Sequence, residues 1–213
     1  MNDSSPSREQ LSKLERFLTV DPGNLRLFTD CAALAVQLED YEALLRAANT
    51  RLRLRPTDIP ASSARGKALL AKGDFQRAAA EFEKVAIAHP ADAAVQQDLG
   101  LCYFSLDDFE WARPPLEAAL ELGERNSGLL RLLISTWHRL GMLARAEELA
   151  SANSDAAHTD AALAGVYARL YLDLKRTAEA SQWAGLALSL DPRNVDARAV
   201  ESALANGHGE PRN

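Results

Sequence analysis

Few residues in this 213-residue chain combine in the patterns that catalytic sites use. Gly66-Lys67-Ala68 resembles the end of a phosphate-binding P-loop, but the earlier glycine and the terminal serine or threonine are absent. No HExxH, GxSxG or GxGxxG motif occurs, and the carboxylates follow the helical spacing of a solvated surface. The histidines are widely scattered: His89, His138, His158 and His208. The sequence therefore predicts a protein that is not an enzyme and holds no cofactor and no metal.

The two cysteines, Cys31 and Cys102, form neither a CxxC pair nor a metal-ligand cluster. Both fall on apolar helical faces, so we expect small buried side chains. The first ten residues lack the cationic start and apolar run of a signal peptide. No apolar stretch approaches the ~18 residues that a transmembrane helix requires. These features predict a cytoplasmic protein without a membrane span, and the Ala-, Leu- and Arg-rich composition is typical of a bacterial source.

The composition is that of a folded protein with an acidic balance. Hydrophobic residues make up 47% and charged residues 25%, and the formal net charge is −6. Such a hydrophobic content argues against a disordered chain. Because an acidic molecule repels polyanions, a nucleic-acid partner is not expected. The length suffices for one large domain or one continuous repeat array.

A period of 34 residues organises the chain. One set of small residues shows it clearly: Ala78, Ala112, Ala146 and Ala180. Prolines keep the same register: Pro22, Pro56 and Pro90 are each 34 residues apart, and Pro192 follows three periods after Pro90. Aromatic residues keep it as well: Tyr103, Trp137 and Tyr171. A fixed period of this length predicts an array of repeated structural units.

The residue types suit two antiparallel helices per repeat. A small residue such as Ala78 lets the helices approach closely, while Phe75 and Phe82 cover the seam between them. Gly73 and Gly141 suit the tight turn between the helices, where a positive φ is needed. The prolines stop the second helix. Because one pair cannot bury its apolar face alone, neighbouring pairs must stack.

This pattern closely resembles the tetratricopeptide repeat (TPR) family, whose signature is Leu-Gly, Tyr, Ala-x3-Phe, Ala and Pro in order. One segment carries Gly66, Gly73, Ala78, Phe82 and Pro90. Another carries Leu99, Gly100, Tyr103, Ala112, Leu116 and Ala119. The resemblance covers almost the whole chain. It implies an all-α fold, a right-handed solenoid of stacked helix-turn-helix repeats.

In TPR register the chain is one array over residues 7–206. It comprises a half repeat, five full repeats and a terminal helix: 7–24, 25–58, 59–92, 93–126, 127–160, 161–194 and 195–206. We expect residues 1–6 and 207–213 to be disordered.

Two segments depart from the pattern of the repeat. Pro114-Pro115 predicts a kink or a late start of the second helix in the third repeat. Residues 151–158 predict a shortened helix and a longer loop.

The resemblance implies that the first helices line a concave groove that binds a partner. The inward-facing repeat positions hold Lys67, Leu70, Gln97, Leu101, Phe104, Arg131, Ser135, His138, Arg139 and Arg169. Apolar and cationic side chains together predict a partner segment with acidic and hydrophobic residues. Arginine suits carboxylates because its planar fork makes two parallel hydrogen bonds. The alternative is that these are ordinary solvated residues, the apolar ones filling gaps between repeats.

Three functions fit these observations. The leading prediction is an adaptor or scaffold, a protein–protein interaction module that binds a peptide or an extended segment of another protein. The second is a bacterial secretion-type TPR chaperone that keeps an export substrate soluble, a role compatible with a homodimer. The third is a regulatory subunit of an enzyme, which differs from the first only in what the partner does. The sequence alone does not name the partner.

Overall fold

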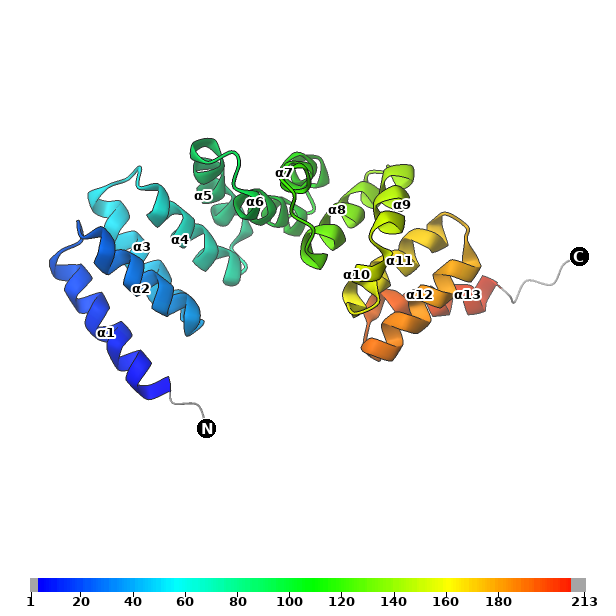
Figure 1. Ribbon diagram of the computed structural model, residues 1–213, viewed down its shortest axis with the longest axis horizontal. Helices are drawn as coiled ribbons and strands as arrows, with labels where there is room; N and C mark the ends of the chain where they lie inside the picture. Colours follow the sequence, from blue (N-terminus) through cyan, green and yellow to red (C-terminus); the bar gives the residue numbers. More distant parts are fainter. Residues whose placement is uncertain (1–3, 208–213) are drawn as a thin grey trace, which may run out of the picture. The chain divides into compact units, whose positions relative to one another are not determined.

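The computed structural model describes residues 4–207, and the regular structure of this range is entirely helical (Figure 1). Thirteen helices follow one another in it, so the expected all-α class is confirmed. The chain divides after Asp107 into two compact units, unit 1 (α1–α6) and unit 2 (α7–α13). Residues 1–3 and 208–213, which were expected to be disordered, lie outside the described range.

The helices keep the 34-residue period. The helices in the first-helix position, including the terminal helix α13, have 13 residues each: α2 (Leu25–Gln37), α4 (Ile59–Ala71), α6 (Ala93–Ser105), α8 (Ser127–Arg139), α11 (Ala161–Asp173) and α13 (Val195–Gly207). The second helices are α3 (Tyr41–Leu54), α5 (Phe75–Ala88), α7 (Phe109–Glu121), α9 (Leu143–Ala152) and α12 (Thr177–Leu190). The first described helix is α1 (Ser4–Val20) and the last, α13, ends at Gly207, so residues 4–6 and 207 are helical rather than disordered. Pro6 is tolerated there because the first turn needs no N–H bond.

Local signals fix both ends of these helices. Each first helix follows an Asn or Asp whose side chain accepts a hydrogen bond from a backbone N–H of the first turn: Asn24, Asp58, Asp92, Asn126, Asp160 and Asn194. Such a cap satisfies an N–H that has no partner inside the helix. At the other end, α1, α3, α5 and α12 stop two residues before a proline of the repeat, as predicted.

The turn between paired helices requires a left-handed backbone. Gly73 and Gly141 have φ of 75° and 72°, which confirms the role expected of them. The same repeat position elsewhere holds Glu39, Asp107 and Lys175, with φ of 53°, 58° and 64°. The turn is therefore kept in all five places, although only glycine adopts it without steric cost.

Unit 1 stacks α1 to α6 in chain order, each helix packing on the next (Figure 1). Ala78 and Phe82 are fully buried, and a Cβ added at Gly66 would lie 3.0 Å from the Phe82 ring, so this seam admits only a small residue. Cys31 and Cys102 are also fully buried, as expected. Burial raises the pKa of their thiols to about 11 and about 12, which makes both unreactive at neutral pH.

Unit 2 packs α11 against α8, α12 and α13, and α8 against α7 and α9. Its core is formed by fully buried residues of α8 and α11: Leu129, Leu130, Leu133, Ile134, Leu163 and Tyr167. The Tyr167 hydroxyl donates a hydrogen bond to the Asn153 carbonyl at 3.1 Å, so its polar end is satisfied inside the core.

Of the two irregularities predicted from the sequence, the shortened helix near residue 151 is confirmed, and the late start of α7 is wrong. Helix α7 begins at Phe109, in register with the other second helices, so the predicted late start at Pro114-Pro115 is wrong. Pro115 lies on its buried face, where packing offsets the missing hydrogen bond. Helix α9 has 10 residues against 14 in α5, which confirms the shortening. The expected long loop after it is instead the short helix α10 (Ser154–Ala157).

Candidate functional site

The ten predicted groove residues fall into two groups, and all lie on first helices. In unit 1, Lys67 and Leu70 lie on α4, whereas Gln97, Leu101 and Phe104 lie on α6. In unit 2, α8 carries Arg131, Ser135, His138 and Arg139, and α11 carries Arg169. The two groups belong to different units of the chain.

In unit 1, the predicted residues are only partly available to a partner. Lys67 is exposed and attracts Asp98 on α6. Burial raises the pKa of Asp98 to about 6 even though the Lys67 charge lowers it. Leu70 is half-buried and packs against the core cluster that contains Phe82. Leu70 therefore fills a gap between helices, as the alternative interpretation expected.

In unit 2, polar contacts join the first helices of successive pairs. His138 Nε2 lies 2.6 Å from Asp173 Oδ2, which connects α8 to α11. Arg169 Nη1 donates to Asp196 Oδ1 at 2.9 Å, which connects α11 to α13. Both side chains are therefore already engaged by carboxylates of the chain itself.

Arg131 and Arg139 differ from those two side chains. Both are exposed, and within residues 4–207 neither forms an ion pair, although the charge of Arg131 attracts the Asp160 carboxylate. The Arg139 guanidinium lies 4.7 Å from the centroid of the Phe109 ring, a cation–π contact that orients it. Together with Ser135, they line one face of α8, because residues three or four apart along a helix are neighbours. We define these three residues as the α8 face. It is the part of the predicted groove in unit 2 whose arginines form no ion pair within the described residues.

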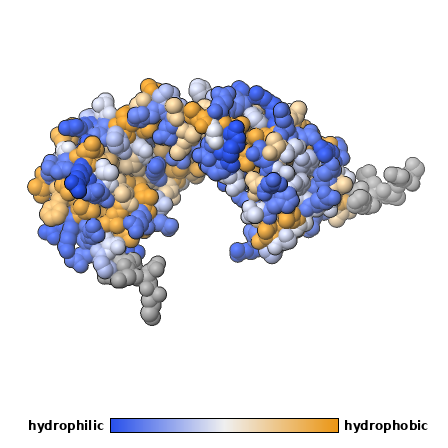
Figure 2. Space-filling view, in the orientation of Figure 1, coloured by the Kyte–Doolittle hydropathy of each residue, from blue (hydrophilic) through white to orange (hydrophobic). Residues whose placement is uncertain are grey.

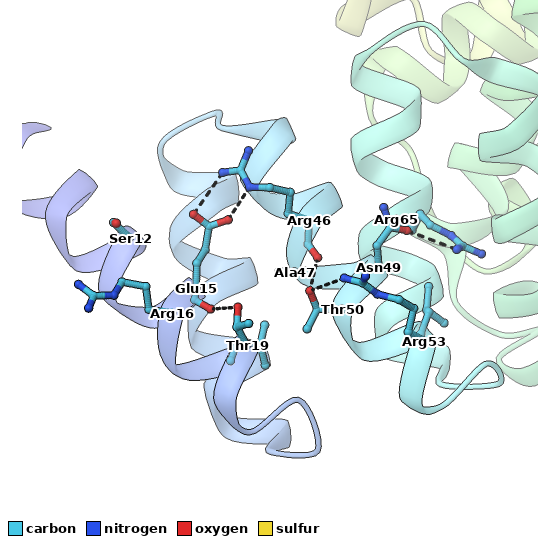
Figure 3. A pocket seen from close by; sticks show the side chains of 12 residues that line it. Ser12, Glu15, Arg16, Thr19, Arg46, Ala47, Asn49, Thr50, Arg53 and Arg65 are labelled. Atoms are coloured by element: carbon cyan, nitrogen blue, oxygen red, sulfur yellow. Dashed lines mark hydrogen bonds and ion pairs between the residues drawn. The ribbon is translucent and has the colours of Figure 1, made fainter.

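The structure also contains a cleft that sequence reasoning missed. It lies in unit 1 between α1 and α3 and has a volume of about 750 Å³ (Figure 3). Its walls carry Ser12, Glu15, Arg16, Thr19, Arg46, Asn49, Thr50, Arg53 and Arg65, and its floor carries Leu18, Ala47 and Leu52. We call it the α1–α3 cleft. Both helices occupy the second-helix position of a repeat, whereas the predicted site residues came only from first helices.

One bidentate ion pair crosses this cleft. Arg46 donates through Nε to Glu15 Oε1 at 2.9 Å and through Nη2 to Glu15 Oε2 at 3.2 Å (Figure 3). The sequence holds a signal for this surface, since Ser12, Glu15 and Thr19 recur at helical spacing along α1. That spacing alone does not reveal the cleft, because it does not say which helix faces them.

Residues 4–207 contain neither a candidate metal site nor a candidate membrane-spanning helix. No group of three or more His, Cys, Asp or Glu side chains in this range could hold a metal ion. None of its helices combines the length and the apolar character needed to cross a membrane.

Sequence comparison matches the chain to two models of the tetratricopeptide repeat, over residues 69–114 and 161–194. No curated protein has a significant sequence match to it. These matches cover different parts of the repeat array.

Structural comparison finds the same fold in solved proteins. YrrB, reported as a TPR protein with an unusual peptide-binding site, matches with a TM-score of 0.74 and 18% identity, over 89% of this chain and 97% of YrrB. PilF from Pseudomonas aeruginosa matches with a TM-score of 0.74 and 12% identity, over 93% and 90% of the two chains. MamA from Desulfovibrio magneticus RS-1 matches with a TM-score of 0.63 and 22% identity, over 71% and 86%. At these identities the likeness concerns the fold alone.

The helix pairs repeat every 34 residues, their fold matches those of solved TPR proteins, and two segments match the repeat in sequence. This chain is therefore a tetratricopeptide repeat protein.

Proposed function

We propose that the chain is a non-catalytic, cytoplasmic adaptor that binds an extended segment of another protein on its first helices. TPR proteins are generally protein-binding modules, and YrrB, which shares the fold, is reported to have a peptide-binding site. The observation that carries the proposal is the α8 face, where Arg131 and Arg139 are exposed without an ion-pair partner in the described chain.

The chemistry of the α8 face favours an acidic partner segment. Each guanidinium can give a carboxylate two parallel hydrogen bonds, and Ser135 can donate a third. The stacking of Arg139 over Phe109 limits its motion, which lowers the entropy lost on binding. His138 and Arg169 border this face but are held by Asp173 and Asp196, so we assign them a supporting role.

Capture from host lysate tests this assignment. The wild type, the variant Arg131→Glu/Arg139→Glu and the control Arg26→Glu/Arg193→Glu are immobilised, and the retained proteins are identified by mass spectrometry. The control makes the same change in net charge at side chains that are 93% and 90% exposed. We expect a partner that the wild type and the control retain and the α8 variant loses, with unchanged helical circular dichroism. Retention by all three would exclude the α8 face.

A secretion-type chaperone remains the second candidate, because unit 1 exposes apolar side chains. Phe17 and Val20, one turn apart on α1, are 59% and 85% exposed. Hydrophobic and hydrophilic patches alternate over the visible face of the unit (Figure 2). A chaperone would bind a largely apolar segment and often be dimeric. Light scattering that gives a monomer, together with a partner rich in carboxylates, would favour the adaptor instead.

A further inference from the structure

We propose that the α1–α3 cleft is a second binding site, separate from the α8 face, and that its ligand is an acidic peptide segment. The inference goes beyond the function proposed above, because it concerns second helices, other residues and the other unit. The test of the cleft is therefore independent of the test of the α8 face.

The shape of the cleft suits a peptide side chain or a short extended segment. Its floor is apolar, since Leu18, Ala47 and Leu52 are at most 6% exposed. The small side chains of Ser12 and Ala47 face it from opposite helices and leave the space open. A floor of this kind accepts the aliphatic part of a ligand while polar walls receive its charges.

The walls carry more positive than negative side chains, although the protein is acidic overall. Four arginines line the cleft against the single carboxylate of Glu15: Arg16, Arg46, Arg53 and Arg65. Arg65 is bound to Glu81 at 2.6 Å and serves the packing of α4 on α5. The other three are exposed, and they are the groups that a ligand would meet.

Two of these three arginines are free to bind. Within residues 4–207, Arg16 forms no hydrogen bond or ion pair, and Arg53 has only a 3.5 Å contact with Thr50 Oγ1. Arg16 lies on the α1 side of the cleft, and in Figure 3 its exposed guanidinium is directed away from α3. Arg46 donates two N–H groups to Glu15, and its other three N–H groups can bind a ligand oxygen. These donors favour carboxylates, which accept two parallel bonds from one guanidinium.

The balance of charges favours a short acidic peptide over a nucleic acid. The whole chain carries a net charge of −6, so a long polyanion is repelled by the surface around the cleft. A short acidic segment senses mainly the charges close to the cleft, because salt screens charges beyond about 8 Å at physiological ionic strength.

Fluorescence anisotropy with labelled deca-glutamate and the full chain tests the proposal. We expect Arg16→Glu/Arg53→Glu to weaken binding at least about tenfold, while Arg26→Glu/Arg193→Glu leaves it within about twofold. Neither Arg16 nor Arg53 supports packing, so the variant should keep its helical circular dichroism. An equal loss in both variants would mean that only net charge matters and would overturn the proposal. So would a loss confined to Arg131→Glu/Arg139→Glu.

A second variant changes the affinity in the opposite direction. Glu15→Gln removes the carboxylate that competes for Arg46, so we expect it to tighten deca-glutamate binding about threefold or more. The matched control is Glu110→Gln in unit 2, whose side chain is 73% exposed. An unchanged affinity in Glu15→Gln would contradict the site. Tighter binding of a ten-nucleotide single-stranded DNA than of deca-glutamate would contradict the proposed ligand class.

Discussion

Arg51 and Asp58 form a buried ion pair in unit 1, with 2.7 Å between Arg51 Nη2 and Asp58 Oδ2 and side chains only 2% and 8% exposed. Asp58 also caps α4 by accepting a hydrogen bond from the Ala61 N–H at 3.0 Å. Arg51 donates to the Gly23 carbonyl at 3.2 Å. The pair therefore connects the end of α3, the start of α4 and the loop before α2.

Arg51→Met should destabilise the chain strongly, because it leaves the Asp58 carboxylate buried without its partner. We expect the free energy of unfolding to fall by about 3–5 kcal/mol, measured by urea denaturation. Arg53→Met is the control, since this neighbouring side chain is exposed and should change stability by no more than about 0.5 kcal/mol. Similar values for the two variants would show that the buried pair contributes little.

Lys175→Gly should stabilise the turn between α11 and α12. Lys175 has φ of 64°, a conformation that costs a residue with a Cβ about 1–2 kcal/mol relative to glycine. The reverse change at the same repeat position, Gly141→Lys, should destabilise by a similar amount, since Gly141 has φ of 72°. Thermal unfolding of both variants measures the effect. If both changes shifted the melting temperature the same way, the steric argument would be wrong.

Asp98→Asn should change how stability depends on pH. Burial raises the pKa of Asp98 to about 6, despite attraction by Lys67, and repulsion by Asp92 adds to the shift. A carboxyl with a raised folded pKa binds more protons in the folded state. Its contribution to stability is therefore present below about pH 4 and is lost as the pH rises through about 6.

Above pH 6, the wild type bears the cost of a charged, largely buried carboxylate that the amide variant avoids. We expect Asp98→Asn to be more stable than the wild type by about 2 kcal/mol at pH 7.5 and by much less at pH 4.5. Urea denaturation at the two pH values measures this difference. The exposed change Asp30→Asn is the control and should show no such dependence. An equal effect of Asp98→Asn at both pH values would contradict the raised pKa.

Gly165→Ala should destabilise unit 2 although alanine favours helices. An added Cβ would lie 2.5 Å from Asn194 Oδ1, the atom that caps α13 by accepting from the Ala197 N–H. Displacing Asn194 also breaks its bond to the Ala161 carbonyl. Loss of such a cap costs about 1 kcal/mol. Gly185→Ala meets open space in α12 and should stabilise by about 0.5–1 kcal/mol, so thermal shifts of opposite sign are the expected result.

Helix positions and the repeat were set by short-range features of the sequence. The caps, the prolines after second helices and the glycines at the turns act within a few residues of each helix end. The 34-residue period then places the same elements in every repeat. Residue type and register therefore suffice to assign Gly73 and Gly141 to turns, and Ala78 and Phe82 to the core. Pro115 shows where such local rules fail. Proline disfavours a helix locally, but α7 continues through Pro115 because this residue packs on the buried face of the helix.

Only the tertiary structure decided how the polar side chains are used. Arg169 and Arg139 look alike in the sequence, but one pairs with Asp196 on the next first helix and the other stacks on Phe109. Residue type and register did not separate them, because their partners lie about 30 residues away. The α1–α3 cleft depends in the same way on which faces of two second helices meet, as at Glu15 and Arg46. Local patterns specify helices, whereas binding surfaces arise from contacts between them.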